Sequence, residues 1–153
     1  MNRVDILRDY INNVLNSITD DEFKAMGYIH LYGVAQASVL LAKKRKLNEE
    51  LCEMGALLHD IYTYQNNTSK DHAVKGAIVA REILEELEIA SYEEIDIICT
   101  AIYNHSSKVM IHDSYSELLK DADVLQHNLY HPDVPNHEKK RYEDLLKELD
   151  LFV

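Results

Sequence analysis

The stretch MGALLHD, residues 54–60, governs the interpretation of the rest of the chain. An uncharged, largely apolar run leads into a histidine and an aspartate, His59 and Asp60. Neighbouring residues of a helix point about 100° apart, so both side chains can reach one point only where a helix ends. The dipeptide occurs by chance in many chains. Its meaning therefore depends on what surrounds it.

The surrounding sequence is helical in character. Apolar residues recur at steps of three and four, and the chain has only four glycines and two prolines. We expect an all-α domain without strands. Asp20, Asn48 and the pair Ser91 and Glu94 are typical of helix starts. The terminal helices are expected within residues 1–19 and 136–153, on either side of the central bundle.

Composition limits the possible functions. The 153 residues fit a single domain, 1–153, and a net charge of −11 disfavours nucleic acid and anionic membranes as partners. No uninterrupted apolar run is as long as a membrane span, and the first ten residues lack the pattern of a signal peptide. Cys52 and Cys99 are typical of core residues in a reducing compartment. We therefore expect a cytoplasmic protein.

Four histidines lie on or beside the apolar stripes of four different helices. They are His30, His59, His72 and His105. A single such residue is most often a satisfied core histidine. Four such histidines together are harder to explain as core residues, because each buried polar nitrogen without a partner lowers the folding stability by about 1–3 kcal/mol. A shared metal ion is the economical explanation.

Two acids flank the apolar stripe of a later helix, Asp121 and Asp123. The helical spacing does not separate them, since each lies about equally far from the centre of the stripe. One is expected to face the metal. For Asp121, two roles stay open: a hydrogen bond to a ligand histidine, or simple solvation.

The chain contains, in this order, His30, the pair His59 and Asp60, and Asp123. This order resembles the H…HD…D signature of the HD-domain metal-dependent phosphohydrolases. The resemblance covers residues 28–129. The strings YIHLYGV (28–34), HAVKGA (72–77) and AIYNHS (101–106) look like small bacterial HD proteins, including dinucleoside tetraphosphate hydrolase-like members. The resemblance implies an all-α bundle of about six to seven helices.

The resemblance also implies a ligand set. His30, His59, Asp60 and Asp123 would hold a first metal, the string Ala122-Asp123-Val124-Leu125 selecting Asp123 over Asp121. Asp60 would bridge to a second ion completed by His72 and His105. One or two divalent ions are expected, with Fe or Mn favoured by resemblance and Mg, Co, Ni and Zn open.

The implied reaction is hydrolysis of a nucleotide or other small phosphate ester by metal-bound hydroxide. His59, Asp60 and Lys75 are the expected catalytic residues, and Lys75 and Lys108 are expected to bind the phosphate. Solvation is the alternative for both lysines. Residues 61–64 lack the Glu-Asp pair of the guanosine-tetraphosphate hydrolases, and no GYP motif is present, which disfavours those substrates and cyclic dinucleotides.

Other interpretations stay open. The chain would be a nucleotide sensor if it bound metal without turnover, a metal-free bundle if the histidines satisfied one another, or, more distantly, an oxidative di-iron protein. We leave a homodimer open. The remaining histidines, 112, 127, 131 and 137, are expected in solvent; His127 draws attention because it follows Asp123 by one helical turn. Tyr62, Tyr64 and Tyr103 are expected in the core or at the rim of the site.

Overall fold

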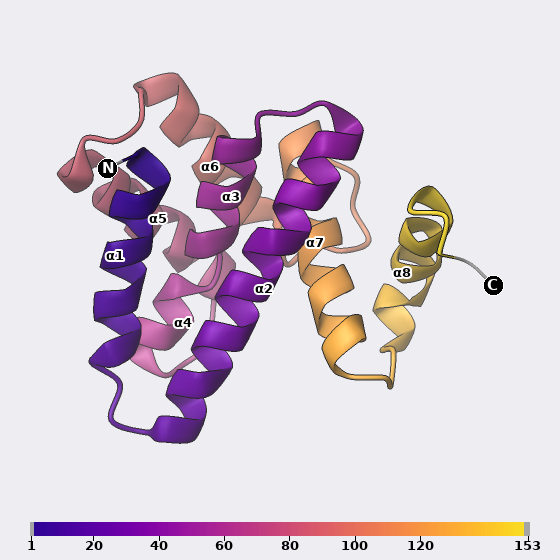
Figure 1. Ribbon diagram of the computed structural model, residues 1–153, viewed down its shortest axis with the longest axis horizontal. Helices are drawn as coiled ribbons and strands as arrows, with labels where there is room; N and C mark the ends of the chain where they lie inside the picture. Colours follow the sequence, from indigo (N-terminus) through magenta and orange to yellow (C-terminus); the bar gives the residue numbers. More distant parts are fainter. Residues whose placement is uncertain (1, 152–153) are drawn as a thin grey trace.

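The computed structural model describes residues 2–151 as an all-helical bundle, with no strand in that range (Figure 1). The expected all-α fold is confirmed. The eight helices are α1 (Arg3–Asn16), α2 (Asp21–Arg45), α3 (Glu49–Leu58), α4 (Ile61–Asn66), α5 (His72–Leu87), α6 (Tyr92–Asn104), α7 (Ser114–Tyr130) and α8 (Asn136–Glu148). The helix that exceeds the expected six to seven is α4, because its six residues are too few to show an apolar period.

The helices begin at the predicted capping residues. The Asp20 carboxylate accepts a hydrogen bond from the Phe23 N–H at 2.9 Å, and the Asn48 amide oxygen accepts one from the Leu51 N–H at 3.2 Å. Ser91 and Glu94 form a reciprocal capping box at the start of α6. Each cap satisfies backbone donors that the helix leaves unpaired, which contributes about 1 kcal/mol.

The terminal helices are shorter than the ranges expected for them. α1 ends at Asn16, where the Ser17 N–H is shared between the Asn13 and Val14 carbonyls and the Ser17 hydroxyl donates to the Val14 carbonyl at 2.7 Å. α8 ends at Glu148, and Asp150 then adopts a left-handed backbone conformation with φ 56° that a helix cannot continue. Residues 1, 152 and 153 of the expected domain lie outside the described residues.

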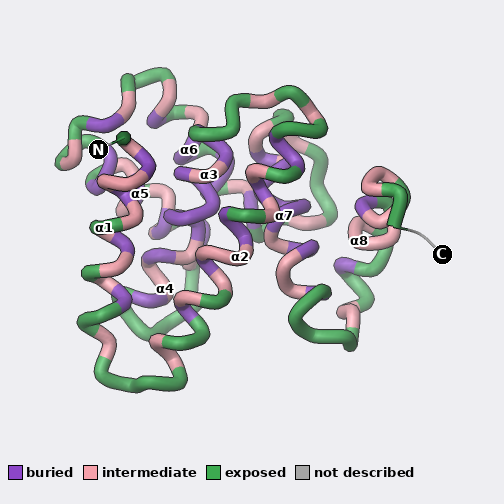
Figure 2. The backbone as a smooth tube through the Cα atoms, viewed as in Figure 1, coloured by how far each residue is buried: buried purple, intermediate pink, exposed green. Residues whose placement is uncertain are grey.

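The core lies between α2, α3, α6 and α7 (Figure 2). α2 packs most extensively against α3 and α7, and its residues Leu31, Val34 and Leu41 are fully buried. Each such side chain contributes about 1.5–3 kcal/mol of hydrophobic stabilisation. Cys52 and Cys99 are buried free thiols, as expected for core residues.

α2 is also the helix, among those described, that is long and apolar enough to cross a membrane by length and composition. No uninterrupted apolar run of that length was predicted from the sequence, and α2 does contain charged and polar residues along its length. Within the bundle, one face of α2 is buried against α3 and α7, and the helix carries His30 toward them. These contacts are those of a core helix.

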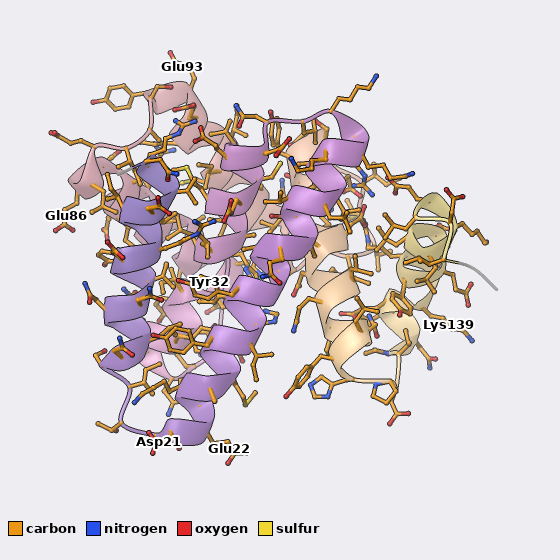
Figure 3. The ribbon with its side chains drawn as sticks, viewed as in Figure 1. Asp21, Glu22, Tyr32, Glu86, Glu93 and Lys139 are labelled. Atoms are coloured by element: carbon orange, nitrogen blue, oxygen red, sulfur yellow. The ribbon has the colours of Figure 1, made fainter. Side chains whose placement is uncertain are left out.

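α1 covers one side of α2. Tyr32 lies between the two helices (Figure 3), and its hydroxyl donates to Oδ1 of Asn12 at 2.7 Å. Arg3 joins α1 to α6 through its ion pair with Glu94 at 2.9 Å. The glutamates at the end of α5, including Glu86, point outward, as the sequence predicted (Figure 3).

α8 lies beyond α7 at one side of the bundle and is attached by ion pairs (Figure 1). Arg141 reaches Asp121 at 2.6 Å and Glu117 at 3.0 Å, and Arg45 of α2 reaches Glu148 at 2.7 Å. Arg45 also contacts Asp121 at 2.6 Å. The two roles considered for Asp121, a hydrogen bond to a ligand histidine and simple solvation, were both wrong. Asp121 is a buried carboxylate between two guanidinium groups, because α2 and α8 both present an arginine to that face of α7.

Candidate metal centre

His59 and Asp60 lie at the junction of two helices. α3 ends at Leu58, His59 keeps helical dihedrals, and Asp60 leaves the helical region with φ −115° and ψ 13° before α4 begins. The change of direction at Asp60 lets both side chains face the same space, as the sequence predicted for a helix end. Gly76 of α5 supports this junction, since a Cβ there would lie 3.3 Å from the His59 carbonyl oxygen.

Three of the expected ligands meet on one side of Asp60. Oδ2 of Asp60 lies 3.1 Å from Nε2 of His30 and 3.4 Å from Nε2 of His59. The two imidazole nitrogens are 3.0 Å apart. Oδ1 of Asp123 completes the group, 3.5 Å from Nε2 of His30 and 3.8 Å from Nε2 of His59.

The other two histidines meet on the opposite oxygen of Asp60. Oδ1 lies 3.3 Å from Nε2 of His105 and 3.5 Å from Nε2 of His72, and these two nitrogens are 3.1 Å apart. The structure therefore brings all six expected ligands together, in overlapping sets whose donor atoms lie within 4.8 Å of one another. The carboxylate of Asp60 lies between the two halves.

Hydrogen bonds at Nδ1 fix the tautomer of every one of these rings. Nδ1 of His59 donates to the Ala56 carbonyl at 2.6 Å, Nδ1 of His72 to the Ser69 carbonyl at 2.9 Å, and Nδ1 of His105 to the Ile102 carbonyl at 2.5 Å. Nδ1 of His30 donates to Oε1 of Gln126 at 2.9 Å. Because these oxygens can only accept, a neutral ring has its lone pair on Nε2, facing Asp60.

This arrangement fits a bound cation. Bare Nε2 atoms 3.0 and 3.1 Å apart repel one another unless a positive charge lies between them. Oδ1 of Asp60 is buried without a hydrogen bond of its own. Four imidazoles and two carboxylates, with no thiolate, suit divalent transition metals. Asp60 would bridge a first position held by His30, His59 and Asp123 and a second held by His72 and His105.

The pKa values in the cluster show which groups would carry a proton when no cation is bound. Burial lowers the pKa of His30, but its hydrogen bond to Asp60 and the charge of Asp123 outweigh burial and raise it to about 9. Burial raises the pKa of Asp60, yet the surrounding histidines hold it well below its usual range. Burial is the main cause of the lowered pKa of His105. In the absence of a metal, a proton on His30 therefore compensates the carboxylates.

The two lysines expected to bind phosphate occupy different environments. Lys108 is not solvated: its side chain is 8% exposed, and Nζ contacts the Asp123 carboxylate and donates to the His105 carbonyl at 2.8 Å. Lys75 places Nζ 5.4 Å from the centre of the Tyr62 ring, on the turn of α5 after His72. The structure thus brings Lys108 to a metal ligand and holds Lys75 over an aromatic ring.

A cavity of about 280 Å³ opens onto the cluster and is called the site cavity below. Its polar lining is His30, Asp60, Tyr64, Gln126, His127 and His131, and Met26, Ile29 and Tyr130 add apolar surface. A larger cavity of about 400 Å³, between α7 and α8, is lined by none of the six ligands. Of the two cavities, the smaller is the one lined by His30 and Asp60.

The partners of several residues in this region were not predicted from the sequence. Gln126, which orients His30, lies one turn after Asp123 on α7, and that spacing was the available signal. Two histidines expected in solvent have protein partners instead: His112 lies 2.7 Å from Nζ of Lys120, and His127 lies 3.0 Å from Glu138. Tyr64 is buried in the wall of the site cavity, whereas Tyr103 is exposed.

Comparison with known proteins identifies a family. The HD domain family model matches residues 27–128, two thirds of the chain and nearly the range 28–129 expected from the resemblance. No curated protein and no solved structure matched. The matched range carries all six residues of the cluster, and HD domains are generally metal-dependent hydrolases. The chain belongs to the HD domain family.

Proposed function

We propose that this protein is a metal-dependent phosphohydrolase acting on a nucleotide or another small phosphate ester. One observation carries the proposal: the two oxygens of Asp60 face two separate histidine pairs, Oδ2 toward His30 and His59 and Oδ1 toward His72 and His105. A carboxylate shared in this way is suited to two adjacent cations, and two adjacent cations are suited to phosphoryl transfer.

Divalent ions, when bound, activate water as a nucleophile and neutralise charge that develops on phosphoryl oxygens. The residues of the chain prepare that chemistry. The carbonyls that accept from Nδ1 of His59, His72 and His105 orient these rings with Nε2 toward Asp60, and Asp123 completes the side of the cluster nearest Lys108.

Local charge favours a phosphate despite the net charge of −11. Two carboxylates are the only formal charges among the six ligands, so two divalent ions leave the cluster positive. Lys108 adds another positive charge beside Asp123. Lys108 lines the larger cavity and not the site cavity, so we propose that it attracts the phosphate through its charge beside Asp123 and not by direct contact. Lys75 reaches the phosphate when Nζ leaves the Tyr62 ring.

The substrate is proposed to be small. The site cavity is at the lower end of the range for ligand pockets, and its apolar residues Met26, Ile29 and Tyr130 suit the base or sugar of a nucleotide. A dinucleoside tetraphosphate, suggested by the sequence resemblance, would extend beyond this cavity across the exposed surface of α2 and α7.

The test combines metal analysis with a substrate panel. Protein purified without chelator is expected to contain a transition metal, which mass spectrometry would detect. With Mn²⁺ or Fe²⁺ added, it is expected to release phosphate from at least one nucleoside monophosphate, nucleoside triphosphate or dinucleoside polyphosphate. Asp60→Ala should lose both metal and activity. The control Asp96→Ala removes an exposed carboxylate of α6 and should keep both. Nucleotide binding without release from any substrate would instead make the protein a sensor.

A further inference from the structure

We propose that His127 protonates the leaving group of the phosphate ester and that Glu138 positions its imidazole. This inference rests on the proposed hydrolase function. His127 lines the site cavity together with His30 and Asp60, and it lies one turn of α7 after Asp123. Its side chain is 39% exposed, so a ligand in the cavity can reach it.

Glu138 holds the imidazole from the opposite side. Its side chain is 8% exposed, and Oε2 accepts a hydrogen bond from Nδ1 of His127 at 3.0 Å. The same oxygen accepts from Nδ2 of Asn128 at 2.9 Å, and Asn128 also donates to the Val124 carbonyl at 2.8 Å. The carboxylate is therefore held in place by α7 itself. This leaves Nε2 as the ring nitrogen that a substrate can meet.

The partner at Nδ1 distinguishes His127 from the histidines of the cluster. Those four donate from Nδ1 to carbonyl or amide oxygens, which carry no charge. A buried carboxylate compensates the charge of a doubly protonated ring far better than a neutral oxygen does. A histidine that is held by a carboxylate, beside a cavity lined by proposed metal ligands, has the arrangement of a general acid.

Other titratable groups face the same region. His131 places its ring centre 5.6 Å from that of His127, and His137 of α8 lies 3.8 Å from the far oxygen of Glu138. His30 of α2 and Asp60 also line the cavity, and Asp123 precedes His127 by one turn. Among these groups, His127 is the one that combines access to the cavity with a buried carboxylate at Nδ1.

Water adds its oxygen to phosphorus, the bond between phosphorus and the leaving oxygen breaks, and the electron pair of that bond stays on the leaving oxygen. The proton on Nε2 of His127 moves to this oxygen, so an alcohol departs and the ring becomes neutral. The proton lost by the attacking water goes to solvent, and the ring takes a proton from solvent before the next turnover.

The experiment compares two esters that differ in their need for that proton. A nucleoside monophosphate expels an alkoxide, which must be protonated, whereas 4-nitrophenyl phosphate expels a stable phenolate. His127→Asn should lower hydrolysis of the nucleotide by about 10²–10⁴-fold and that of 4-nitrophenyl phosphate by less than about tenfold. Glu138→Gln should change the ratio in the same direction. The control Asp96→Asn removes an exposed carboxylate of α6 that does not line the site cavity, and it should leave the ratio of the two rates at the wild-type value.

Two further measurements separate a chemical role from a structural one. Metal content of His127→Asn should equal that of the wild type, and the NMR signal of the His127 Nδ1 proton should shift in Glu138→Gln. Equal losses on both esters, or a wild type that hydrolyses only the phenyl ester, would overturn the role of His127 while leaving the hydrolase intact. A wild type that hydrolyses neither ester nor any nucleotide would overturn the proposed function and this inference with it.

Discussion

Removing metal from this protein should make its folding stability depend on pH through His30. Burial lowers the pKa of His30, but Asp60 and Asp123 raise it to about 9 in the folded protein, against about 6.5 in the unfolded chain. The folded state therefore binds this proton more tightly. The resulting stabilisation is fully present below about pH 6.5 and is lost as the pH rises through about 9.

The magnitude follows from the two pKa values. Between about pH 6.5 and 8.5, the metal-free protein should lose about 2 kcal/mol of unfolding free energy, which lowers Tm by about 4–8 °C for a domain of this size. The carboxyl pKa values of Asp60 and Asp123 lie well below their usual range, so the stability that these groups contribute stays constant in this window. Burial lowers the pKa of His105, which confines its effect to pH below about 6.5.

The upper limit of the window is set by the cysteines. Burial raises the pKa of Cys52 to about 12 and that of Cys99 to about 11, so above about pH 8.5 the unfolded thiols ionise while the folded ones do not. Stability then falls for a reason unrelated to the metal centre. The unfolded thiols are already partly ionised at about pH 8.5, so the metal-free His30→Asn variant, which keeps both cysteines, is needed to measure their share of the fall.

The assay is thermal unfolding of chelator-treated protein, followed by far-UV circular dichroism at constant ionic strength. Metal-loaded wild type is the first control, because an ion on Nε2 of His30 leaves no proton to lose. Metal-free His30→Asn is the second control. A Tm of the metal-free wild type that stays constant across the window, or a fall that His30→Asn reproduces in full, would refute the assignment to His30.

Three other predictions follow from single contacts. Gly76→Leu should destabilise the fold by about 1–3 kcal/mol and lower metal content, because even a Cβ at this position lies 3.3 Å from the His59 carbonyl; equilibrium unfolding and metal analysis test both effects. Arg141→Met should lower the free energy of unfolding by about 3 kcal/mol, because it removes a partner of buried Asp121. The control Lys140→Met, on the exposed side of α8, should change it by less than about 0.5 kcal/mol. Urea unfolding measures both. Ser91→Ala should cost about 1 kcal/mol through loss of the capping box and leave metal content unchanged, and a simultaneous loss of metal would contradict the local role.

Much of the fold was predictable because its signals are local. A capping side chain bonds a backbone N–H three residues away, and an amphipathic stripe repeats every three to four residues, so Asp20, Asn48 and Ser91 marked helix starts without any knowledge of packing. α4 was not predictable, since six residues between the junction at Asp60 and the following loop carry no such repeat.

The same division applies within the metal centre. Three ligand rings are oriented by carbonyls three residues earlier in the chain, those of His59, His72 and His105, so their placement at helix ends is a local property. His30 is oriented by Gln126, 96 residues away, and Glu138 reaches His127 from another helix. Contacts across such separations depend on how the helices pack.

Asp121 and Asp123 show most directly where local pattern stops being informative. They stand two residues apart on α7, and the helical repeat places them about equally far from its apolar stripe. In the bundle, Arg45 of α2 and Arg141 of α8 enclose Asp121, while Asp123 faces His30, His59 and Lys108. Which charge each acid meets was decided by the packing of α2 and α8 against α7, because those partners lie far away in the chain and come close only on folding.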